Sequence, residues 1–175
     1  WARDVLTGDM RHGNRHGLRL VRGSHIIVRR LFDYDQPYFL QLEDGRIIFA
    51  IPSERNFTLI GTTDVDHEGD AEAAVCSNAE RDYLIAAASS FFRSGISRDD
   101  IVTTFSGVRP LYDDGASSAS AATRDYVLTC EDEGGAAALV NVFGGKITTY
   151  RRLAEHVMDS LHPVSYTHLT LPTRS

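Results

Sequence analysis

Short apolar segments separated by turn residues dominate the first third of the chain. Ser24–Val28 is rich in β-branched residues, which is typical of a strand. Tyr38–Leu42 and Arg46–Ile51 flank the turn Glu43–Gly45, so they predict a hairpin closed by Asp-Gly. After a further turn, Phe57–Gly61 predicts another strand. Four strands in succession without an intervening helix indicate an antiparallel sheet.

A helix and three more strands are expected in the remainder. Ser77 or Asn78 can cap the helix, Glu80 lies in its first turn, and Gly95 closes it. Its apolar positions recur at helical spacing: Tyr83, Leu84, Ala87, Ala88 and Phe91. The later strands are predicted at 101–108, 126–130 and 138–143, and a final helix at about 148–161. This mixture is α/β, with an α+β portion made by the antiparallel strands.

The composition excludes some classes of protein. With 24 acidic and 18 basic residues, the net charge is -6, which gives no broad electrostatic basis for binding nucleic acid. Hydrophobic residues make up 42% of the chain, enough for a globular core, and no apolar run approaches a membrane span in length. Cys76 and Cys130 form no CxxC pair, and we expect two buried free thiols in a reducing compartment.

The two ends differ from the rest of the chain. Residues 1–24 are basic and contain several glycines, so we expect a loop that leads into the first strand. The chain starts at Trp1, without an initiator Met, which suggests an internal fragment. Residues 162–175 contain two prolines and three threonines with no periodic pattern. We expect a non-native or disordered tail there and exclude it from the fold.

A glycine pair after the last predicted strand is the strongest local indication of a ligand. Gly144 and Gly145 permit close approach of the backbone to a bound group. The helix start that follows offers N–H groups without intrahelical partners, which suits an anionic or electron-rich edge. Lys146 adds a positive charge, and Thr148 or Thr149 can cap the helix or donate to a ligand. A tight turn with a solvated lysine would use the same residues.

Two arginines are candidates for binding an anion. Arg109 is held in direction by the proline that follows it, and its guanidinium offers forked donors for a carboxylate or phosphate. An ion pair with an acidic residue is the favoured alternative for Arg109. Arg124 lies at the start of a predicted strand and is a similar candidate. The neighbouring Asp125 can simply neutralise its charge.

One histidine and one acidic segment complete the candidates. His25 lies inside a predicted strand, where a lone histidine usually has a structural role. A role as general base would require a perturbed pKa and a substrate within reach. The segment 64–70 contains three aspartates, one glutamate and one histidine, but their spacing matches no EF-hand or zinc pattern. We expect an acidic, solvated turn there and no metal site.

Six short motifs occur in the same order as in a known family. They are Arg22–His25; Ile51–Pro52 with Ile60–Asp64; Ser97–Ile101; Ser106–Pro110; Thr123–Tyr126; and Phe143–Arg151. From Trp1 to about Leu161 the chain therefore resembles the respiratory, FAD-dependent glycerol-3-phosphate dehydrogenases. Each motif alone is weak evidence, whereas six in order are specific.

The resemblance implies a fold of the glycine and D-amino-acid oxidase type, in which an antiparallel substrate domain interleaves with an FAD domain. It implies a partial domain at 1–161, with a substrate-binding sheet at about 22–130 and an FAD-contacting strand–turn–helix at about 138–161. It also implies oxidation of sn-glycerol 3-phosphate to dihydroxyacetone phosphate, with electrons passing through FAD to a quinone. The complete enzyme would be cytoplasmic and attached peripherally to the inner membrane, with a homodimer as one expected assembly.

The resemblance also assigns roles to residues. Arg109, Arg124 and Lys146 would surround the substrate and its phosphate, and His25 would lie near the reacting hydroxyl. His25, Arg109 and Lys146 are thus the expected catalytic residues, and the stretch Gly144–Thr149 would contact FAD.

The family's GxGxxG fingerprint for the dinucleotide is absent from this sequence, so we expect the chain alone to be inactive. Two other functions stay open. A related FAD-dependent amine or amino-acid oxidase would use an arginine to bind a carboxylate. A catalytically silent module would hold anions through Arg109 and Arg124.

Overall fold

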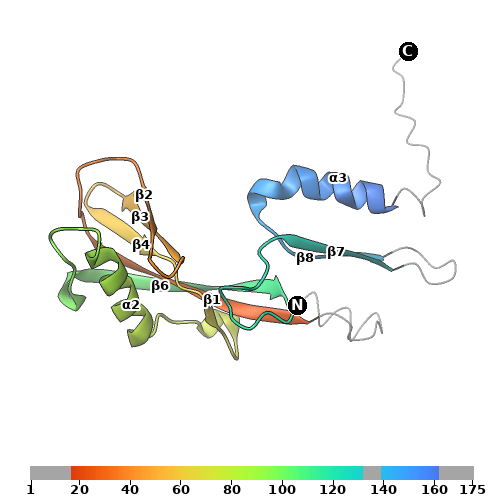
Figure 1. Ribbon diagram of the computed structural model, residues 1–175, viewed down its shortest axis with the longest axis horizontal. Helices are drawn as coiled ribbons and strands as arrows, with labels where there is room; N and C mark the ends of the chain where they lie inside the picture. Colours follow the sequence, from red (N-terminus) through yellow and green to blue (C-terminus); the bar gives the residue numbers. More distant parts are fainter. Residues whose placement is uncertain (1–16, 132–138, 162–175) are drawn as a thin grey trace, which may run out of the picture. The chain divides into compact units, whose positions relative to one another are not determined.

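The computed structural model describes residues 17–131 and 139–161 (Figure 1). The chain divides into two compact units, Trp1–Ala122 and Thr123–Ser175, and each is described by itself. The expected loop up to residue 16, the expected tail 162–175 and Ala138 lie outside the described residues. In the described ranges, no helix has the length and apolar character needed to cross a membrane.

Six strands of the first unit form one antiparallel sheet, which confirms the expected architecture of this region. They are β1 (Leu18–Arg29), β2 (Tyr38–Gln41), β3 (Ile47–Ser53), β4 (Phe57–Gly61), β5 (Val65–Asp66) and β6 (Ile101–Tyr112). β1 is central and pairs with β4, β5 and β6, while β3 joins β2 to β4. The long strand β1 therefore connects the other parts of the sheet.

The hairpin between β2 and β3 closes as predicted. Leu42 N–H donates to the Arg46 carbonyl at 2.8 Å, and Gly45 N–H donates to the Leu42 carbonyl at 3.0 Å. Gly45 has a φ of 81°, in the left-handed region that glycine adopts without a steric penalty. The Asp-Gly sequence thus sets the turn through local geometry alone.

Two strands are longer than the sequence indicated. β1 begins at Leu18 rather than Ser24, and β6 continues through Pro110 to Tyr112 rather than ending at Val108. The reason is their mutual pairing, which covers almost the whole length of both strands. A proline is tolerated in β6 because, among the described strands, β6 pairs only with β1 and so has a free edge.

The pairing of β1 with β6 contains one irregularity. Ile27 lies opposite Thr103, but Val28 lies opposite Ile101, so Val102 is an extra residue on β6. This arrangement is a β-bulge, which bends the strand locally. From the bulge back to the start of β1, the register is uninterrupted.

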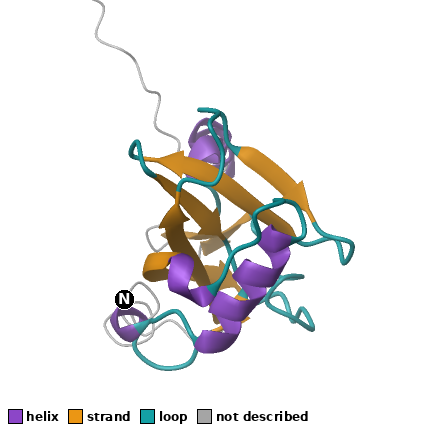
Figure 2. Cartoon of the chain, turned by 90° about the vertical axis from the view of Figure 1, so that its left-hand side faces the viewer, coloured by secondary structure: helices purple, strands orange, loops and turns teal. Residues whose placement is uncertain are grey.

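Helix α2 (Asn78–Ser89) packs on one face of this sheet (Figure 2). Ser77 caps the helix and Glu80 completes a capping box with it, which confirms the predicted start. The helix ends before Ser90, whose hydroxyl donates to a carbonyl of the last turn at 2.7 Å. It therefore does not run on to Gly95, where we expected its end.

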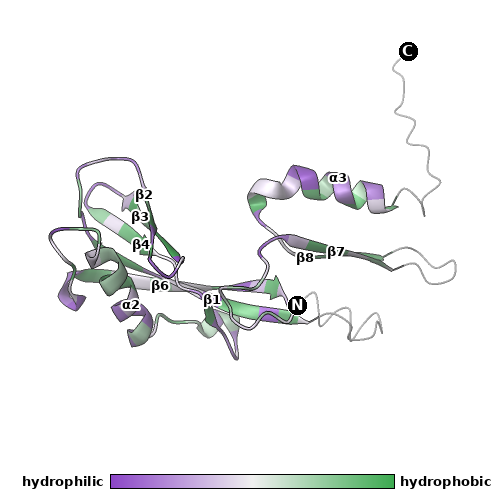
Figure 3. Cartoon of the chain, viewed as in Figure 1, coloured by the Kyte–Doolittle hydropathy of each residue, from purple (hydrophilic) through white to green (hydrophobic). Residues whose placement is uncertain are grey.

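Apolar side chains between α2 and the sheet form the main core. They come from alternate strand positions, from one side of α2 and from the turn after it: Ile26, Val28, Leu40, Ile48, Ala50, Ile60, Leu84, Ala87, Ala88 and Ile96. Figure 3 shows the apolar stretches on β3 and β4 that supply part of this core. Because side chains alternate across a strand, the sequence neighbours of these residues lie on the opposite face of the sheet.

The second unit contains a strand pair and a helix. Its elements are β7 (Tyr126–Glu131), β8 (Leu139–Gly144), the 3-10 helix η4 (Ile147–Thr149) and α3 (Tyr150–Leu161). We expected 126–130 in the substrate-binding sheet, but β7 pairs with β8 instead. The final helix begins at Tyr150 rather than near Thr148. The reason is that Thr149 N–H donates to the Lys146 carbonyl at 3.0 Å and makes a 3-10 turn first.

The two cysteines have different surroundings. Both are free thiols, and Cys76 is buried as expected. Cys130 is exposed, so the prediction of two buried thiols is wrong for this residue. The physical reason is that Cys130 lies on β7, in a two-stranded sheet, and not in the large sheet that packs against α2.

Candidate functional site

The face of the large sheet opposite α2 carries aromatic and apolar side chains that remain exposed. Phe39, Phe49, Ile51 and Phe105 are each between 37% and 59% exposed. Three of them are sequence neighbours of core residues in β2 and β3, and Phe105 lies opposite His25 in the strand register. We call this surface the open face and define it by these four residues and His25.

His25 is enclosed by its two neighbouring strands. Its imidazole stacks on Phe105 of β6, with 4.7 Å between ring centroids and 5° between the ring planes. On the other side, Gly61 of β4 lies opposite His25. A Cβ added at Gly61 would lie only 2.6 Å from Cγ and 2.7 Å from Nε2 of the imidazole. A larger residue at position 61 would therefore displace the ring or the strand.

The imidazole of His25 is not satisfied by hydrogen bonds. Its Nδ1 atom is buried and has no hydrogen-bond partner among the described residues. Burial, and next the positive charge of Arg109, lower the pKa of His25 below its ordinary value of 6.5. The ring is therefore neutral near neutral pH. An unpaired buried nitrogen is not the mark of a satisfied structural histidine, and it strengthens the hypothesis that His25 serves a ligand.

Arg109 projects from β6 beside the same histidine. It lies opposite Val21 in the register, and Gly23 makes room for its guanidinium, since a Cβ there would lie 2.7 Å from Cζ. The guanidinium donates to Thr62 Oγ1 at 3.1 Å and to Asp64 Oδ1 at 3.4 Å. The ion pair that we considered is thus present, but it is long, and the Arg109 side chain stays 35% exposed. Donor capacity is left for an anion.

The acidic segment after β4 supplies ion-pair partners and a cap. Asp64 pairs with Arg109, and Asp66 accepts from Arg19 Nε at 2.6 Å. Asp70 accepts from Glu72 N–H at 2.9 Å and starts a short 3-10 helix. In residues 17–131 and 139–161, no three His, Cys, Asp or Glu side chains cluster as a metal site would require.

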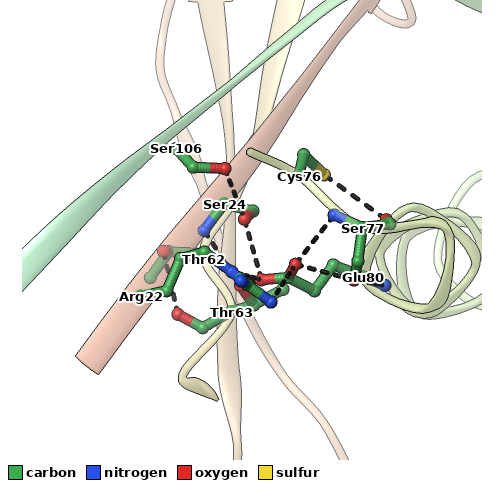
Figure 4. Close-up of polar contacts among 8 residues, drawn as sticks. All are labelled: Arg22, Ser24, Thr62, Thr63, Cys76, Ser77, Glu80 and Ser106. Carbon is green, nitrogen blue, oxygen red and sulfur yellow. Dashed lines mark hydrogen bonds and ion pairs between the residues drawn. The ribbon is translucent and has the colours of Figure 1, made fainter. Parts of the chain in front are cut away.

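Glu80 joins the first turn of α2 to the sheet (Figure 4). Its Oε1 accepts from Ser24 Oγ at 2.7 Å, from Thr63 Oγ1 at 2.8 Å and from Arg22 Nε at 3.3 Å. Its Oε2 accepts from the N–H and hydroxyl of Ser77 at 2.9 and 2.8 Å, and pairs with Arg22 Nη2 at 2.9 Å. Both carboxylate oxygens are thus fully used.

These donors keep Glu80 ionised although it is only 4% exposed. Burial alone would raise the pKa of the carboxyl group. The backbone N–H of Ser77 and the hydroxyls of Ser24, Thr63 and Ser77 outweigh that effect and lower the pKa to about 2. The sequence pattern indicated a cap at Ser77 or Asn78 and placed Glu80 in the first turn. It did not indicate the bonds of Glu80 to the sheet, because these connect residues far apart in the chain.

The glycine pair of the second unit forms an exposed corner between β8 and η4. Gly144 and Gly145 have φ values of 66° and 91°, so both require the left-handed conformation. A Cβ at Gly145 would also lie 3.0 Å from the Cβ of Tyr126. Lys146 is the exposed N-cap residue of η4, and Ile147 is 89% exposed. The corner therefore offers accessible backbone and a positive charge, which fits an electron-rich ligand edge.

Arg124 belongs to the same end of the second unit. It is half-buried in the loop before β7, and Tyr126 at the start of β7 lies opposite Gly144 at the end of β8. The antiparallel pairing thus brings Arg124 and Lys146 to one end of the strand pair. Thr148 is exposed, and the hydroxyl of Thr149 donates to the Lys146 carbonyl at 2.8 Å.

The predicted site residues therefore fall into two groups. His25 and Arg109 lie together in the first unit, beside Thr62, which we did not single out. Arg124, Lys146 and the glycine corner lie together in the second unit. Glycines within strands could have indicated Gly23 and Gly61, because a strand glycine often marks the close approach of another group.

Comparison with known proteins identifies the family. Residues 1–151 match the family described as FAD dependent oxidoreductase. The chain belongs to this family. Among curated proteins it is 48% identical, over 163 residues, to the aerobic glycerol-3-phosphate dehydrogenase of Escherichia coli K12. It is 47% identical, over 161 residues, to the D-erythritol 1-phosphate dehydrogenase of Brucella abortus. These matches cover 93% and 92% of the chain but 32% of each relative.

A solved structure supports the same assignment. The glycerol-3-phosphate dehydrogenase of Bacillus halodurans, complexed with FAD, matches with a TM-score of 0.67 and 31% identity, over 92% of this chain and 30% of that one. The expected family, its oxidase-type fold and FAD as its cofactor are thereby confirmed. The chain spans about a third of the length of the relatives it matches.

Proposed function

We propose that this chain provides part of the substrate site of an FAD-dependent dehydrogenase that oxidises sn-glycerol 3-phosphate to dihydroxyacetone phosphate. The observation that carries the proposal is the pair on the first unit, a neutral His25 with an unpaired Nδ1 beside a partly exposed Arg109. The names of the relatives at 48% and 47% identity supply the substrate class, a phosphorylated polyol.

Each residue has a task in this reaction. The forked donors of Arg109 bind an anionic group of the substrate and stabilise negative charge that develops on the C2 oxygen. His25, neutral near neutral pH, accepts the proton of the C2 hydroxyl. Arg124 and Lys146 add positive charge for the phosphate. Positive charge favours a phosphate more strongly than a neutral polyol.

FAD would be held in part by the glycine corner and the residues after it. The left-handed Gly144 and Gly145 expose backbone, Lys146 presents an ammonium group, and Thr148 and Thr149 offer hydroxyls. When bound, FAD supplies the acceptor for the hydride from C2. The role of the chain is to orient the substrate and remove the hydroxyl proton.

A second substrate has comparable support. The D-erythritol 1-phosphate dehydrogenase is 47% identical to the chain, against 48% for the glycerol-3-phosphate dehydrogenase. Both substrates carry a phosphate and a secondary hydroxyl, so Arg109 and His25 would serve them alike. Whatever distinguishes the two must act on the additional hydroxymethylene carbon of the longer substrate.

A segment exchange tests the proposal. Residues 1–161 replace the matching third of the E. coli enzyme, and an artificial electron acceptor reports turnover. We expect oxidation of glycerol 3-phosphate and no oxidation of glycerol. Faster oxidation of D-erythritol 1-phosphate would select the second substrate. Oxidation of amines or amino acids alone would indicate the oxidase alternative, and anion binding without any flavin reduction would indicate the silent module.

Further features of the complete enzyme belong to the same proposal. The family resemblance supports a quinone as electron acceptor, peripheral attachment to the cytoplasmic side of the inner membrane, and a homodimer. Reduction of a quinone held in phospholipid vesicles tests the first, and sedimentation of the exchanged enzyme with the vesicles tests the second. Light scattering of the purified enzyme tests the third. A monomer that stays in the supernatant and reduces only soluble acceptors would contradict all three.

A further inference from the structure

Glu80 makes more contacts than a helix cap needs. A capping box requires one carboxylate oxygen to accept the N-cap backbone N–H. Oε2 does this with Ser77. Oε1 is directed to the sheet, where it accepts from Ser24 and Thr63. Helix formation alone gives no reason for these two bonds, which lie in the buried layer between α2 and the sheet.

Ser24 of β1 and Thr63 of the β4–β5 connection are the immediate neighbours of site residues. Ser24 precedes His25, and Thr63 follows Thr62, whose hydroxyl accepts from Arg109 at 3.1 Å. The two are also bonded to each other, since Ser24 N–H donates to Thr63 Oγ1 at 2.9 Å. Because side chains alternate across a strand, Ser24 faces α2 while His25 faces the open side.

A third contact extends the network to β6. Ser24 Oγ lies 2.7 Å from the hydroxyl oxygen of Ser106, which belongs to the same strand as Phe105 and Arg109 (Figure 4). The carboxylate of Glu80 thus accepts from a hydroxyl of β1 and from one of the β4–β5 connection, and it reaches Ser106 of β6 through Ser24. β6 carries Phe105, whose ring stacks on His25, and Arg109 itself. The β4–β5 connection carries Thr62 and Asp64, to which Arg109 donates.

We propose that Glu80 is a positioning residue, which holds His25 and the Thr62–Arg109 pair in place from the covered side of the sheet. This inference rests on the proposed function for its effect on catalysis. Glu80 itself touches neither the open face nor any group expected to react. Its influence passes through Ser24 and Thr63 to the backbone of the adjoining residues.

The charge of Glu80 is essential to this role. Arg22 donates to both carboxylate oxygens, from Nε to one and from Nη2 to the other. In Glu80→Gln the amide NH₂ therefore faces a guanidinium N–H in either orientation of the side chain. Two donors that face each other are forced apart, and the hydroxyls of Ser24 and Thr63, which are bonded to Glu80, shift with its side chain.

Three variants of the exchanged enzyme separate positioning from helix stability. Glu80→Gln removes the charge, and Thr63→Val removes one hydroxyl of the network at nearly constant volume. Ser77→Ala weakens the cap but leaves the bonds of Glu80 to the sheet, and is the control. We expect kcat/KM for glycerol 3-phosphate to fall about tenfold to a hundredfold in the first two variants, with kcat lowered as well as KM raised. The control, measured well below its Tm, keeps the kcat/KM of the parent.

A spectroscopic measurement makes the test independent of turnover. The imidazole carbon resonances of His25, assigned by their loss in His25→Gln, are compared in the parent and the three variants. We expect them to shift in Glu80→Gln and Thr63→Val and to stay in place in Ser77→Ala. Unchanged resonances, or losses of kcat/KM no larger than in the control at equal fraction folded, would overturn the proposal. A parent that oxidises no polyol phosphate would refute the proposed function instead, and the resonances would still decide the role of Glu80.

Discussion

The two faces of the large sheet are built from alternate residues of the same strands, yet they differ in the burial of their apolar side chains and in the hydrogen bonding of their polar groups. On the face toward α2, Ile26 and Ile60 are fully buried and the polar Ser24 is bonded to Glu80. On the open face, Phe49 stays 39% exposed and the Nδ1 atom of His25 has no partner among the described residues.

This difference separates the face that stabilises the fold from the face that carries the candidate site. On the covered face, the hydroxyls of Ser24 and Thr63 and the carboxylate of Glu80 are hydrogen-bonded to one another, as buried polar groups in a core usually are. The open face leaves donor capacity on Arg109 and a lone pair on His25, which cost stability unless a ligand uses them. Because side chains alternate along a strand, the strand residues next to the core residues form the candidate site on the opposite face.

The largest effect is expected at Arg109. In the exchanged enzyme, Arg109→Ala should lower kcat/KM by about 10²–10³, because a fixed donor to developing charge is lost. Arg109→Lys should not restore it, since an ammonium group lacks the forked donors. The matched control is Arg98→Ala, which removes an exposed ion pair with Asp82 and should leave kcat/KM unchanged. Near-normal turnover of the lysine variant would assign Arg109 to the structure alone.

The covered face can be tested through pH. Glu80 has a folded-state pKa of about 2 against 4.5 when unfolded, so the unfolded chain binds more protons between these values. Its stabilising contribution is present above pH 4.5 and is lost as the pH falls toward 2, by up to about 3 kcal/mol in the free energy of unfolding. Urea denaturation across this range should show a smaller loss in Glu80→Gln. Parallel curves for the two chains would contradict the assignment.

Two strand glycines allow the same change, an added methyl group, to be made beside His25 and away from it. Gly61→Ala places a methyl group against the His25 ring and should lower kcat/KM by up to about 10², as expected when a catalytic group is displaced by about 1 Å. Gly107→Ala is the matched control, because an added Cβ there meets nothing within 4 Å. Equal activity of the two variants would show that the position of His25 does not matter to turnover.

The smallest effect concerns the charge around His25. Arg109→Gln should raise the pKa of His25, because a like charge is removed, but leave it below 6.5, because burial is the larger cause. Since the folded-state pKa is lowered, His25 costs stability as the pH falls through 6.5, and that cost should shrink in the variant. NMR titration of the imidazole measures the change. A pKa that stays where it was would place the charge of Arg109 outside the reach of the ring.

Local features of the fold were readable from the sequence, and long-range ones were not. The Asp-Gly hairpin and a helix cap at Ser77 or Asn78 depend on residues close together in the chain, and both were predicted. The partner of β7 and the length of β1 depend on pairings with distant segments, so neither followed from local pattern. The six motifs gave the family, because their order along the chain is itself long-range information.

The candidate site shows the same division. His25, Arg109 and Lys146 were proposed through their motifs and stay a prediction. The structure shows surroundings for His25 and Arg109 that no periodicity describes. Glu80 was placed only in the first turn of the helix, because its bonds to the sheet join segments separated by up to 58 positions. Predicting them requires knowing that Ser24 faces the helix, and that follows only once the register of β1 is fixed.

The bulge at Val102 bears on how chains of this kind change length during evolution. A slip of one residue in a strand pair exchanges every side chain between the two faces. The bulge confines such a slip to the end of β6 that begins with Ile101, while Phe105 and Arg109 keep their register with β1. Val102, which is 51% exposed, is the residue that absorbs the difference. Insertions or deletions in the loop before β6 can thus be absorbed without moving Phe105 and Arg109 to the other face of the sheet.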